Sequence, residues 1–282
     1  MDEKGLGKQL QAARQTAGLT QQALCHKAGL SYSTLAKIER GAIKAPSIFT
    51  IQGIASALGL SLADLMGDIG QKTPERLTKT SKSGVRFVYF DINGCLVRFF
   101  HRAFTKIATD SGAAPDLIET AFWHDNDDVC RGDLSIDDFN ASFGRQFGLP
   151  DFDWRVYYLE SIEPIAGMQE LVRWAAENYR IGLLSNIMPG QIDTMMKRHI
   201  LPTVAYDAVV DSSQTGAIKP EPKMYQAAQA AAGCAPNEIL LVDDSRTNLM
   251  AAEKLHWKVL WFDDYRPAES VQRVRAALEP AE

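Results

Sequence analysis

An aspartate at the end of an apolar run is the residue of this sequence best placed to do chemistry. The run spans residues 85–90, Asp91 follows it directly, and Gly94 comes shortly afterwards. β-branched and aromatic residues without polar alternation are typical of a strand buried on both faces of a parallel sheet. Open α/β sheets bind their ligands beyond the carboxyl ends of such strands. We therefore expect Asp91 to lie in a functional site, on a sharp turn that Gly94 permits.

Other polar groups occupy similar positions further along the chain. Ser185 ends a short apolar run, Asp243-Asp244 ends another, and Lys219 lies between them before a proline. Phosphoryl transfer needs a nucleophile, a cation and hydrogen-bond donors around the developing charge. Carboxylates at strand ends are also the hard oxygen ligands that suit Mg²⁺. Together these residues indicate Mg²⁺-assisted phosphoryl chemistry, although each one alone is also typical of an ordinary loop or strand end.

The same residues resemble the motifs of the haloacid dehalogenase (HAD) superfamily. The string D-I-N-G-C-L at residues 91–96 is similar to motif I, usually D-x-D-G-T-L, whose first aspartate is the nucleophile. The resemblance implies catalytic roles for Asp91, Asn93, Ser185 and Lys219. It implies Mg²⁺ ligation by Asp91, Asn93, Asp243 and Asp244, with Asp243 or Asn248 supporting Asp244. The sequence looks most similar to helical-capped sugar-phosphate phosphatases and to epoxide-hydrolase N-terminal domains. It differs from dehalogenases proper because the acidic pair of motif IV is kept. The expected ligand is a small phosphorylated metabolite.

Motif I departs from the family pattern at Asn93, where the family has a second aspartate. In family phosphatases that aspartate protonates the leaving oxygen and then activates the hydrolytic water, while its backbone carbonyl ligates Mg²⁺. An asparagine keeps the carbonyl but has no proton to exchange near neutral pH. Loss of a general acid/base typically lowers the rate by ~10²–10⁴-fold. We therefore expect metal and phosphate binding with weak or no turnover, which describes a sensor better than an efficient phosphatase.

Apolar runs alternate with helical patterns after residue 85, which indicates βαβ units and an α/β doubly wound parallel sheet. Residues from about 98 to 162 interrupt this alternation with helical spacing, at the place where the HAD family inserts a helical cap. Candidate ligand contacts in this cap, each also compatible with a purely structural role, are His101, Arg102, Trp123, His124 and Arg131.

Residues 1–66 have the pattern of a separate all-α helix-turn-helix bundle that ends in a fifth helix at 61–66. Thr20 and Ser31 can cap two successive helices, and Gly29 lies in the turn between them. Two helices joined by a glycine-containing turn form the helix-turn-helix arrangement. Residues 19–41, L-T-Q-Q-A-L-C-H-K-A-G-L-S-Y-S-T-L-A-K-I-E-R-G, closely resemble the Cro/cI (XRE) repressor family.

This second resemblance implies contacts with an operator in double-stranded DNA. Polar and basic residues on and beside the third helix would meet base edges and phosphates. The implied DNA-binding residues are Gln21, Tyr32, Ser33, Thr34, Lys37 and Arg40. Arg14 and Glu39 match a partly buried ion pair that braces the helices. A helical bundle used only for dimerisation is the alternative interpretation.

The composition of this multi-domain chain of 282 residues indicates where its domains meet and where the protein is located. Residues 67–84 are rich in Thr, Ser, Lys and Gly and poor in hydrophobic residues, so we expect a flexible linker before the HAD-like domain at 85–282. No signal peptide pattern or run of ~20 apolar residues is present, and the four cysteines form no C-x-x-C pair, so we expect a cytoplasmic location and no membrane partner.

The favoured function is a dimeric transcription regulator with a HAD-like sensor of a phosphorylated ligand. The sequence leaves two alternatives open. One is a working phosphatase, in which a cap residue or the substrate supplies the proton that Asn93 lacks. The other is an antitoxin-like module whose HAD-like domain binds a partner protein.

Overall fold

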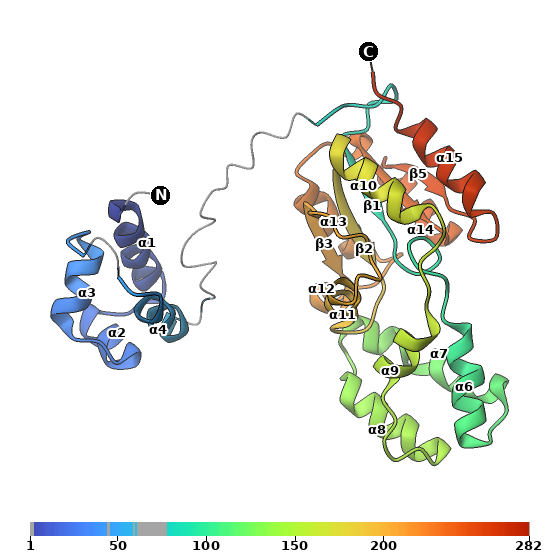
Figure 1. Cartoon of the computed structure of the whole chain (residues 1–282), viewed down its shortest axis with the longest axis horizontal. Coiled ribbons are helices and arrows are strands. Elements are labelled where there is room, and N and C mark those ends of the chain that lie inside the picture. Colours follow the sequence, from blue (N-terminus) through green and yellow to red (C-terminus); the bar gives the residue numbers. More distant parts are fainter. Residues whose placement is uncertain (1–2, 44–45, 59, 61–77, 282) are drawn as a thin grey trace. The chain divides into compact units, whose positions relative to one another are not determined.

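The chain forms two compact units, Met1–Arg76 and Leu77–Glu282, in a computed structural model. The structure describes residues 3–43, 46–58, 60 and 78–281 (Figure 1). The predicted helix at 61–66 and most of the predicted linker therefore lie outside the described residues.

The first unit is helical, as predicted. Its described helices are α1 (Glu3–Thr16), α2 (Gln21–Ala28), α3 (Tyr32–Glu39) and α4 (Ile48–Leu58). The hydroxyl of Thr20 accepts a hydrogen bond from the Ala23 N–H at the start of α2, and Ser31 accepts one from the Thr34 N–H at the start of α3. These caps satisfy amide donors that a helix leaves free at its first turn. The two helices are thereby fixed at the boundaries that the sequence predicts.

The second unit is built on a five-stranded parallel sheet. In chain order its strands are β1 (Phe87–Phe90), β2 (Arg180–Ser185), β3 (Ala208–Asp211), β4 (Ile239–Asp243) and β5 (Lys258–Trp261). They lie in the order β3-β2-β1-β4-β5, so the chain reverses its direction of travel across the sheet beside the central strand β1. Ligands of doubly wound sheets bind at such a reversal, beyond the carboxyl ends of the strands.

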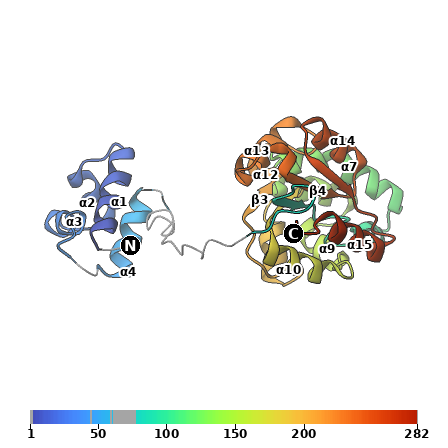
Figure 2. The ribbon, with the colours of Figure 1, turned by 90° about the horizontal axis from the view of Figure 1, so that it is seen from above.

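Helices cover both faces of this sheet (Figure 2). They are α10 (Met168–Asn178), α11 (Gln191–Lys197), α12 (Ser212–Thr215), α13 (Pro222–Ala232), α14 (Arg246–Lys254), α15 (Pro267–Ala277) and the short η1 (Pro236–Glu238). Val88 and Phe90 of β1 pack into one hydrophobic cluster, whereas Phe87 and Tyr89 pack into the other. Both faces of β1 are therefore buried, which explains why its sequence lacks polar alternation.

A helical cap is inserted between β1 and α10, as the interrupted pattern at 98–162 predicts. Its helices are α6 (His101–Ser111), α7 (Pro115–Arg131), α8 (Ile136–Phe147) and α9 (Trp154–Ser161). Aromatic side chains fill its interior, including Phe104, Phe122 and Trp154, whose rings contact one another. The chain enters and leaves the cap side by side, because Val97 pairs with Pro164 and the Arg98 N–H donates to the Glu163 carbonyl.

Residues 78–84, which the sequence assigned to the linker, hydrogen-bond to the second unit. The Lys79 N–H donates to the Asn178 carbonyl, Ser81 pairs with Pro280, and Lys82 forms an ion pair with Glu279 at 2.8 Å. These contacts are largely made by the backbone, so a composition rich in Ser, Lys and Gly does not prevent them. The folded part of this unit therefore begins before Val85.

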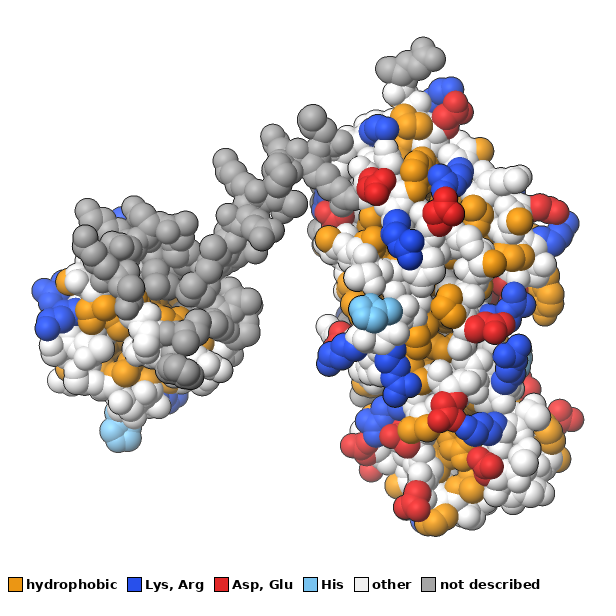
Figure 3. Space-filling model, viewed as in Figure 1, with side chains coloured by type: hydrophobic (Ala, Val, Ile, Leu, Met, Phe, Trp, Pro, Cys, Tyr) orange, Lys and Arg blue, Asp and Glu red, His pale blue; other side chains and the backbone are white. Residues whose placement is uncertain are grey.

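The surface charge and the lengths of the helices also bear on function. Acidic and basic side chains are interspersed over the face of the second unit that Figure 3 shows. Among the described residues, no helix has both the length and the apolar composition needed to cross a bilayer.

Candidate active site and DNA-binding surface

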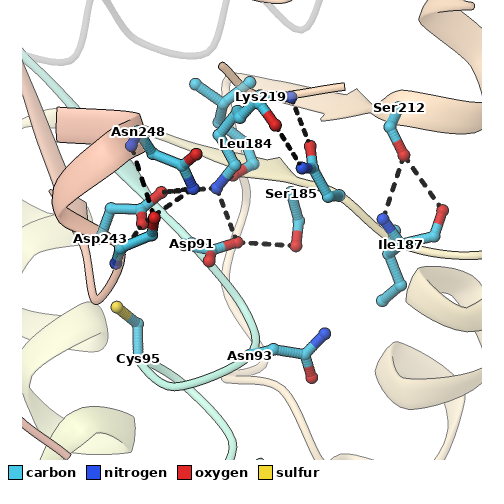
Figure 4. A network of polar contacts seen from close by, with 12 residues as sticks. Asp91, Asn93, Cys95, Leu184, Ser185, Ile187, Ser212, Lys219, Asp243 and Asn248 are labelled. Carbon is cyan, nitrogen blue, oxygen red and sulfur yellow. Dashed lines mark hydrogen bonds and ion pairs between the residues drawn. The ribbon is translucent and has the colours of Figure 1, made fainter. Parts of the chain in front are cut away.

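Asp91 lies at the carboxyl end of the sheet, directly after β1, and is only 7% exposed. Its backbone N–H donates to the Val242 carbonyl of β4, which continues the parallel ladder by one residue. Its Oδ1 accepts a hydrogen bond from Ser185 Oγ at 2.7 Å and lies 3.0 Å from Lys219 Nζ (Figure 4). Burial raises the pKa of Asp91, while Lys219 and Ser185 act in the opposite direction.

Lys219 is buried at the centre of this group. Its Nζ donates to Asp243 Oδ2 at 2.6 Å and to the Leu184 carbonyl at 2.8 Å, besides its contact with Asp91. Burial opposes the charge of this ammonium, but Asp243 and Asp91 outweigh it and raise the pKa of Lys219 above its ordinary value. The lysine is therefore a fixed positive charge between two carboxylates, and its three N–H donors are all engaged.

Three carboxylates converge next to Lys219. Asp91, Asp243 and Asp244 each offer one oxygen, and these oxygens lie within 4.8 Å of one another. Asn248 Nδ2 and the Ser245 N–H hold Asp243 in place at 3.1 Å and 2.8 Å. Burial, followed by the charges of Asp91 and Asp243, raises the pKa of Asp244 to about 7. A hard divalent cation would relieve this repulsion, so the donor set fits Mg²⁺.

Gly94 is required for this convergence. Its φ is +79°, and a Cβ at this position would collide with the carboxylate of Asp244. Glycine is the residue that adopts such a conformation without steric cost and also leaves room for a side chain against its Cα. The glycine of motif I thus lets the carboxyl end of β4 approach the loop after β1.

Asn93 faces away from Lys219, on the cap side of Asp91 (Figure 4). Its Oδ1 accepts a hydrogen bond from the Tyr158 hydroxyl of α9 at 2.8 Å. Burial raises the pKa of Tyr158, so this hydroxyl stays protonated as a donor. No residue in the described ranges hydrogen-bonds to Asn93 Nδ2, which leaves both of its N–H donors for a ligand.

A cavity of about 330 Å³ lies between the cap and the sheet. Asp91, Asn93 and Asp244 line it from the sheet side, and Trp123 and Tyr158 line it from the cap. This volume, at the lower end for small-molecule sites, suits a small metabolite. The site therefore combines a buried carboxylate, hydrogen-bond donors and a metal-type cluster with a cavity for a ligand.

The predicted DNA-binding residues lie on the surface of the first unit. Tyr32 is 54% exposed, and Ser33, Lys37 and Arg40 are also exposed, while Thr34 is half-buried and bonded to Ser31. Gln21 donates to Glu39 Oε2 at 2.7 Å, so its amide orientation is fixed by its neighbour. These positions are compatible with the predicted contacts, whose roles toward DNA stay predictions.

The buried ion pair that the sequence predicts beneath this surface is present. Arg14 donates to both carboxylate oxygens of Glu39, at 2.7 Å from Nε and 3.2 Å from Nη2. Two parallel hydrogen bonds of this kind fix relative orientation as well as distance. The pair joins α1 to α3 and also positions Gln21.

Family comparisons agree with this division into units. A helix-turn-helix family model matches residues 10–65, and a haloacid dehalogenase-like hydrolase model matches residues 136–262. The chain joins a Cro/cI-type helix-turn-helix domain to a HAD-like domain. The HAD-like match covers Ser185, Lys219 and the Asp243-Asp244 pair but begins after motif I, so Asp91 and Asn93 lie outside it.

Individual proteins show the same two similarities. The helix-turn-helix domain is 40% identical over 63 residues to the immunity repressor protein of Bacillus phage phi105, which is 22% of this chain and 43% of the repressor. The HAD-like domain is similar to a predicted HAD-like hydrolase from Porphyromonas gingivalis (26% identity, TM-score 0.56), with 67% of this chain and 97% of that chain covered. It shares its fold with a HAD family enzyme from Bacteroides thetaiotaomicron solved with magnesium and inorganic phosphate (21% identity, TM-score 0.54, covering 63% and 94%).

The cap residues that the sequence suggested as ligand contacts fall into two groups in the structure. Trp123 lines the cavity, whereas His101, Arg102 and His124 do not. Arg131 instead donates to Glu221, beside Lys219, at 2.8 Å and so joins the cap to the core.

Tyr158 and Gln191 line the cavity of the HAD-like domain but were not predicted from the sequence. Tyr158 lies in α9 next to a second tyrosine, and Gln191 follows a Pro-Gly pair. Neither context contains a motif that could have identified them.

Proposed function

We propose that this chain is a transcription regulator. Its helix-turn-helix domain binds an operator, and its HAD-like domain binds a small phosphorylated ligand with Mg²⁺ as a sensor with weak or no phosphatase activity. The observation that carries the proposal is an otherwise complete phosphoryl site, Asp91 with Ser185, Lys219 and the carboxylate cluster, in which Asn93 takes the place of the acid/base.

Each side chain of the site has a separate role in binding. Ser185 and Lys219 orient Asp91, and the amide N–H of Asn93 is free to donate to a phosphoryl or leaving-group oxygen. Asp91, Asp244, Asp243 and the backbone carbonyl of Asn93 would hold Mg²⁺, which neutralises phosphoryl charge when bound. Because an amide donates a hydrogen bond but transfers no proton near neutral pH, the ligand is held and not efficiently consumed.

The proposed partner of the first unit is double-stranded DNA. The support is the similarity to a phage repressor, together with an exposed α3 surface carrying Tyr32, Ser33 and Lys37. We further propose a homodimer, in which two copies of α3 would meet half-sites about one helical turn of DNA apart.

Mg²⁺ should stabilise the HAD-like domain, and Asp244→Ala should abolish this effect. At a metal concentration of 100 Kd the expected gain is about 2.7 kcal/mol in the free energy of unfolding. Thermal unfolding with and without millimolar Mg²⁺ measures it, with Asp151→Ala, at an exposed carboxylate, as the matched control. A wild-type melting temperature indifferent to Mg²⁺ would refute the metal site.

The regulatory role is tested by DNA binding in the presence of a ligand. Affinity for DNA upstream of the protein's own operon should change about 5–150-fold when Mg²⁺ and a bound phosphomonoester are added, the usual size of coupling between sites. Asp244→Ala should keep DNA binding and lose the response. An unchanged affinity across a broad phosphometabolite panel would reject the sensor, and ordinary phosphatase rates in the wild type would establish the enzyme alternative instead.

A further inference from the structure

The backbone carbonyl of Asp244 accepts a hydrogen bond from a tryptophan outside the cavity. The donor is the indole Nε1–H of Trp261, the last residue of β5, at 2.8 Å. Trp261 is not among the described residues that line the cavity, whereas Asp91, Asn93 and Asp244 are. The indole therefore meets the carboxylate cluster through the backbone of Asp244 and not through a ligand.

This hydrogen bond holds one end of a peptide group whose other end is also held. The carbonyl of the peptide between Asp244 and Ser245 is bound by Trp261, while its N–H donates to Asp243 Oδ1 at 2.8 Å. Because a peptide group is planar, fixing both of its polar ends fixes the rotation of the whole plane. The direction of the chain as it leaves Asp244, and with it the orientation of the Cα that carries the carboxylate, is therefore restrained.

The orientation of Asp244 matters because its carboxylate lies in a crowded place. Its Oδ2 lies against Gly94, where an added Cβ would collide with it, and one of its oxygens lies within 4.8 Å of oxygens of Asp91 and Asp243. Like charges at this separation repel one another and favour rotation of Asp244 away from the cluster. A restraint on the backbone of Asp244 opposes that rotation.

The indole of Trp261 is itself held by two helices. The guanidinium of Arg246, the first residue of α14, lies 4.3 Å from the ring centroid, and that of Arg273 in α15 lies 5.7 Å from it. Guanidinium groups at such distances are attracted by the π electrons of an indole. The backbone of Trp261 is fixed as well, since β5 pairs with β4 and places Trp261 opposite Asp243. The N–H donor is therefore fixed in direction by contacts that involve no metal.

We infer that Trp261 is a positioning residue of the metal site, which holds the backbone of Asp244 so that its carboxylate points toward Asp91 and Asp243. This inference rests on the proposed function, because it takes the carboxylate cluster as the site of Mg²⁺. An indole N–H donates a hydrogen bond and accepts none, so the role depends on a single donor.

Titration calorimetry of the full chain with Mg²⁺ tests this role in Trp261→Phe, which keeps an aromatic ring and removes the N–H. The dissociation constant for Mg²⁺ should rise about 10–100-fold, the usual effect of removing a group that orients a metal ligand.

Trp174→Phe is the matched control. Trp174 is a half-buried tryptophan of α10 in the same domain, with the guanidinium of Arg275 4.8 Å from its ring centroid. Its indole N–H, however, has no hydrogen-bond partner among the residues that the structure describes. The control variant should leave the affinity for Mg²⁺ unchanged.

Ca²⁺ provides a readout that a loss of folded protein would not give. Mg²⁺ requires nearly ideal octahedral geometry, whereas Ca²⁺ accepts flexible geometry and longer ligand distances. A carboxylate that is less well oriented should therefore weaken Mg²⁺ more than Ca²⁺, so the ratio of the two affinities should shift toward Ca²⁺ in Trp261→Phe. Partial unfolding would weaken both cations by the same factor.

Replacing Trp261 by 3-benzothienylalanine tests the N–H even if Trp261→Phe does not fold. This analogue keeps both rings of the indole and replaces only the N–H by sulfur. Its melting temperature without metal should stay close to that of the wild type, and its affinity for Mg²⁺ should fall about 10–100-fold. Full Mg²⁺ affinity in this protein would overturn the role of the N–H.

The outcomes separate this inference from the proposal beneath it. If the wild type binds Mg²⁺ and both proteins without the N–H bind it equally well, or lose Mg²⁺ and Ca²⁺ by one common factor, Trp261 has no positioning role and the proposed function stands. If the wild type binds no Mg²⁺, the proposed metal site fails and this inference fails with it.

Discussion

Replacing Asn93 by aspartate should raise the rate of phosphomonoester hydrolysis by about 10²–10⁴-fold, the usual contribution of a general acid/base. The Tyr158 hydroxyl already donates to Oδ1 of residue 93, and an aspartate oxygen can accept the same hydrogen bond. The second carboxyl oxygen would take the position of Nδ2, which has no partner among the described residues. The exchangeable proton is therefore expected on the oxygen that faces the ligand.

Steady-state hydrolysis of a generic phosphomonoester with Mg²⁺ measures this gain. Asp91→Asn in the Asn93→Asp background should remove it, because the nucleophile is lost while the side-chain shape is kept. The gain should also weaken ligand-dependent control of DNA binding, since the protein would then destroy its own signal. An Asn93→Asp protein that stays inert toward a broad panel would contradict the phosphoryl site and favour a partner-binding module.

Operator affinity should fall steeply in a Tyr32→Ala, Lys37→Ala double variant. Both side chains are exposed on α3, and loss of one good contact with DNA weakens binding by about 1–3 kcal/mol. If Lys37 neutralises a phosphate, its removal should also reduce the salt dependence of binding by about one released ion. Fluorescence anisotropy at several salt concentrations measures both quantities.

The fold of the double variant should survive. The core of this domain and the Arg14–Glu39 pair lie beneath the substituted surface, so its melting temperature should stay close to that of the wild type. Lys197→Ala removes the same charge from an exposed position in the HAD-like domain and serves as the matched control. Equal operator affinity in the wild type and the double variant would show that α3 is not the reading surface.

The sequence predicted those parts of the molecule that local rules determine. The hydroxyl caps at Thr20 and Ser31 set helix starts because each one bonds an amide three residues away. Asp91, Ser185 and Asp243 were predicted at or directly after strand ends, and the parallel sheet brings these ends to one edge. The helix caps and the string at residues 19–41 were enough to predict the first fold, and the order of the motifs was enough to predict the second.

The ligand-facing residues of the cap could not be predicted, because they depend on how the cap packs against the sheet. Tyr157 and Tyr158 are neighbours in α9 and look alike in the sequence. The first donates to Asp110 within the cap, whereas the second donates to Asn93 across the cavity. Only the rotation of α9 against the core distinguishes them, and that rotation is set by contacts distant in the sequence.

The hydrogen bond between Tyr158 and Asn93 has a consequence for the speed of the proposed response. It joins a cap helix to the loop that carries Asp91, so any movement of α9 away from the core that widens the cavity must first break this bond. Cap movements of this kind take microseconds to milliseconds or longer, and they would slow the departure of a ligand that the cap contacts. After the ligand concentration falls, the occupied state persists for its own residence time, and promoter occupancy follows with that delay. A lower rate of cap opening would lengthen the residence time of the ligand, and so the proposed regulatory response, without changing the equilibrium affinity.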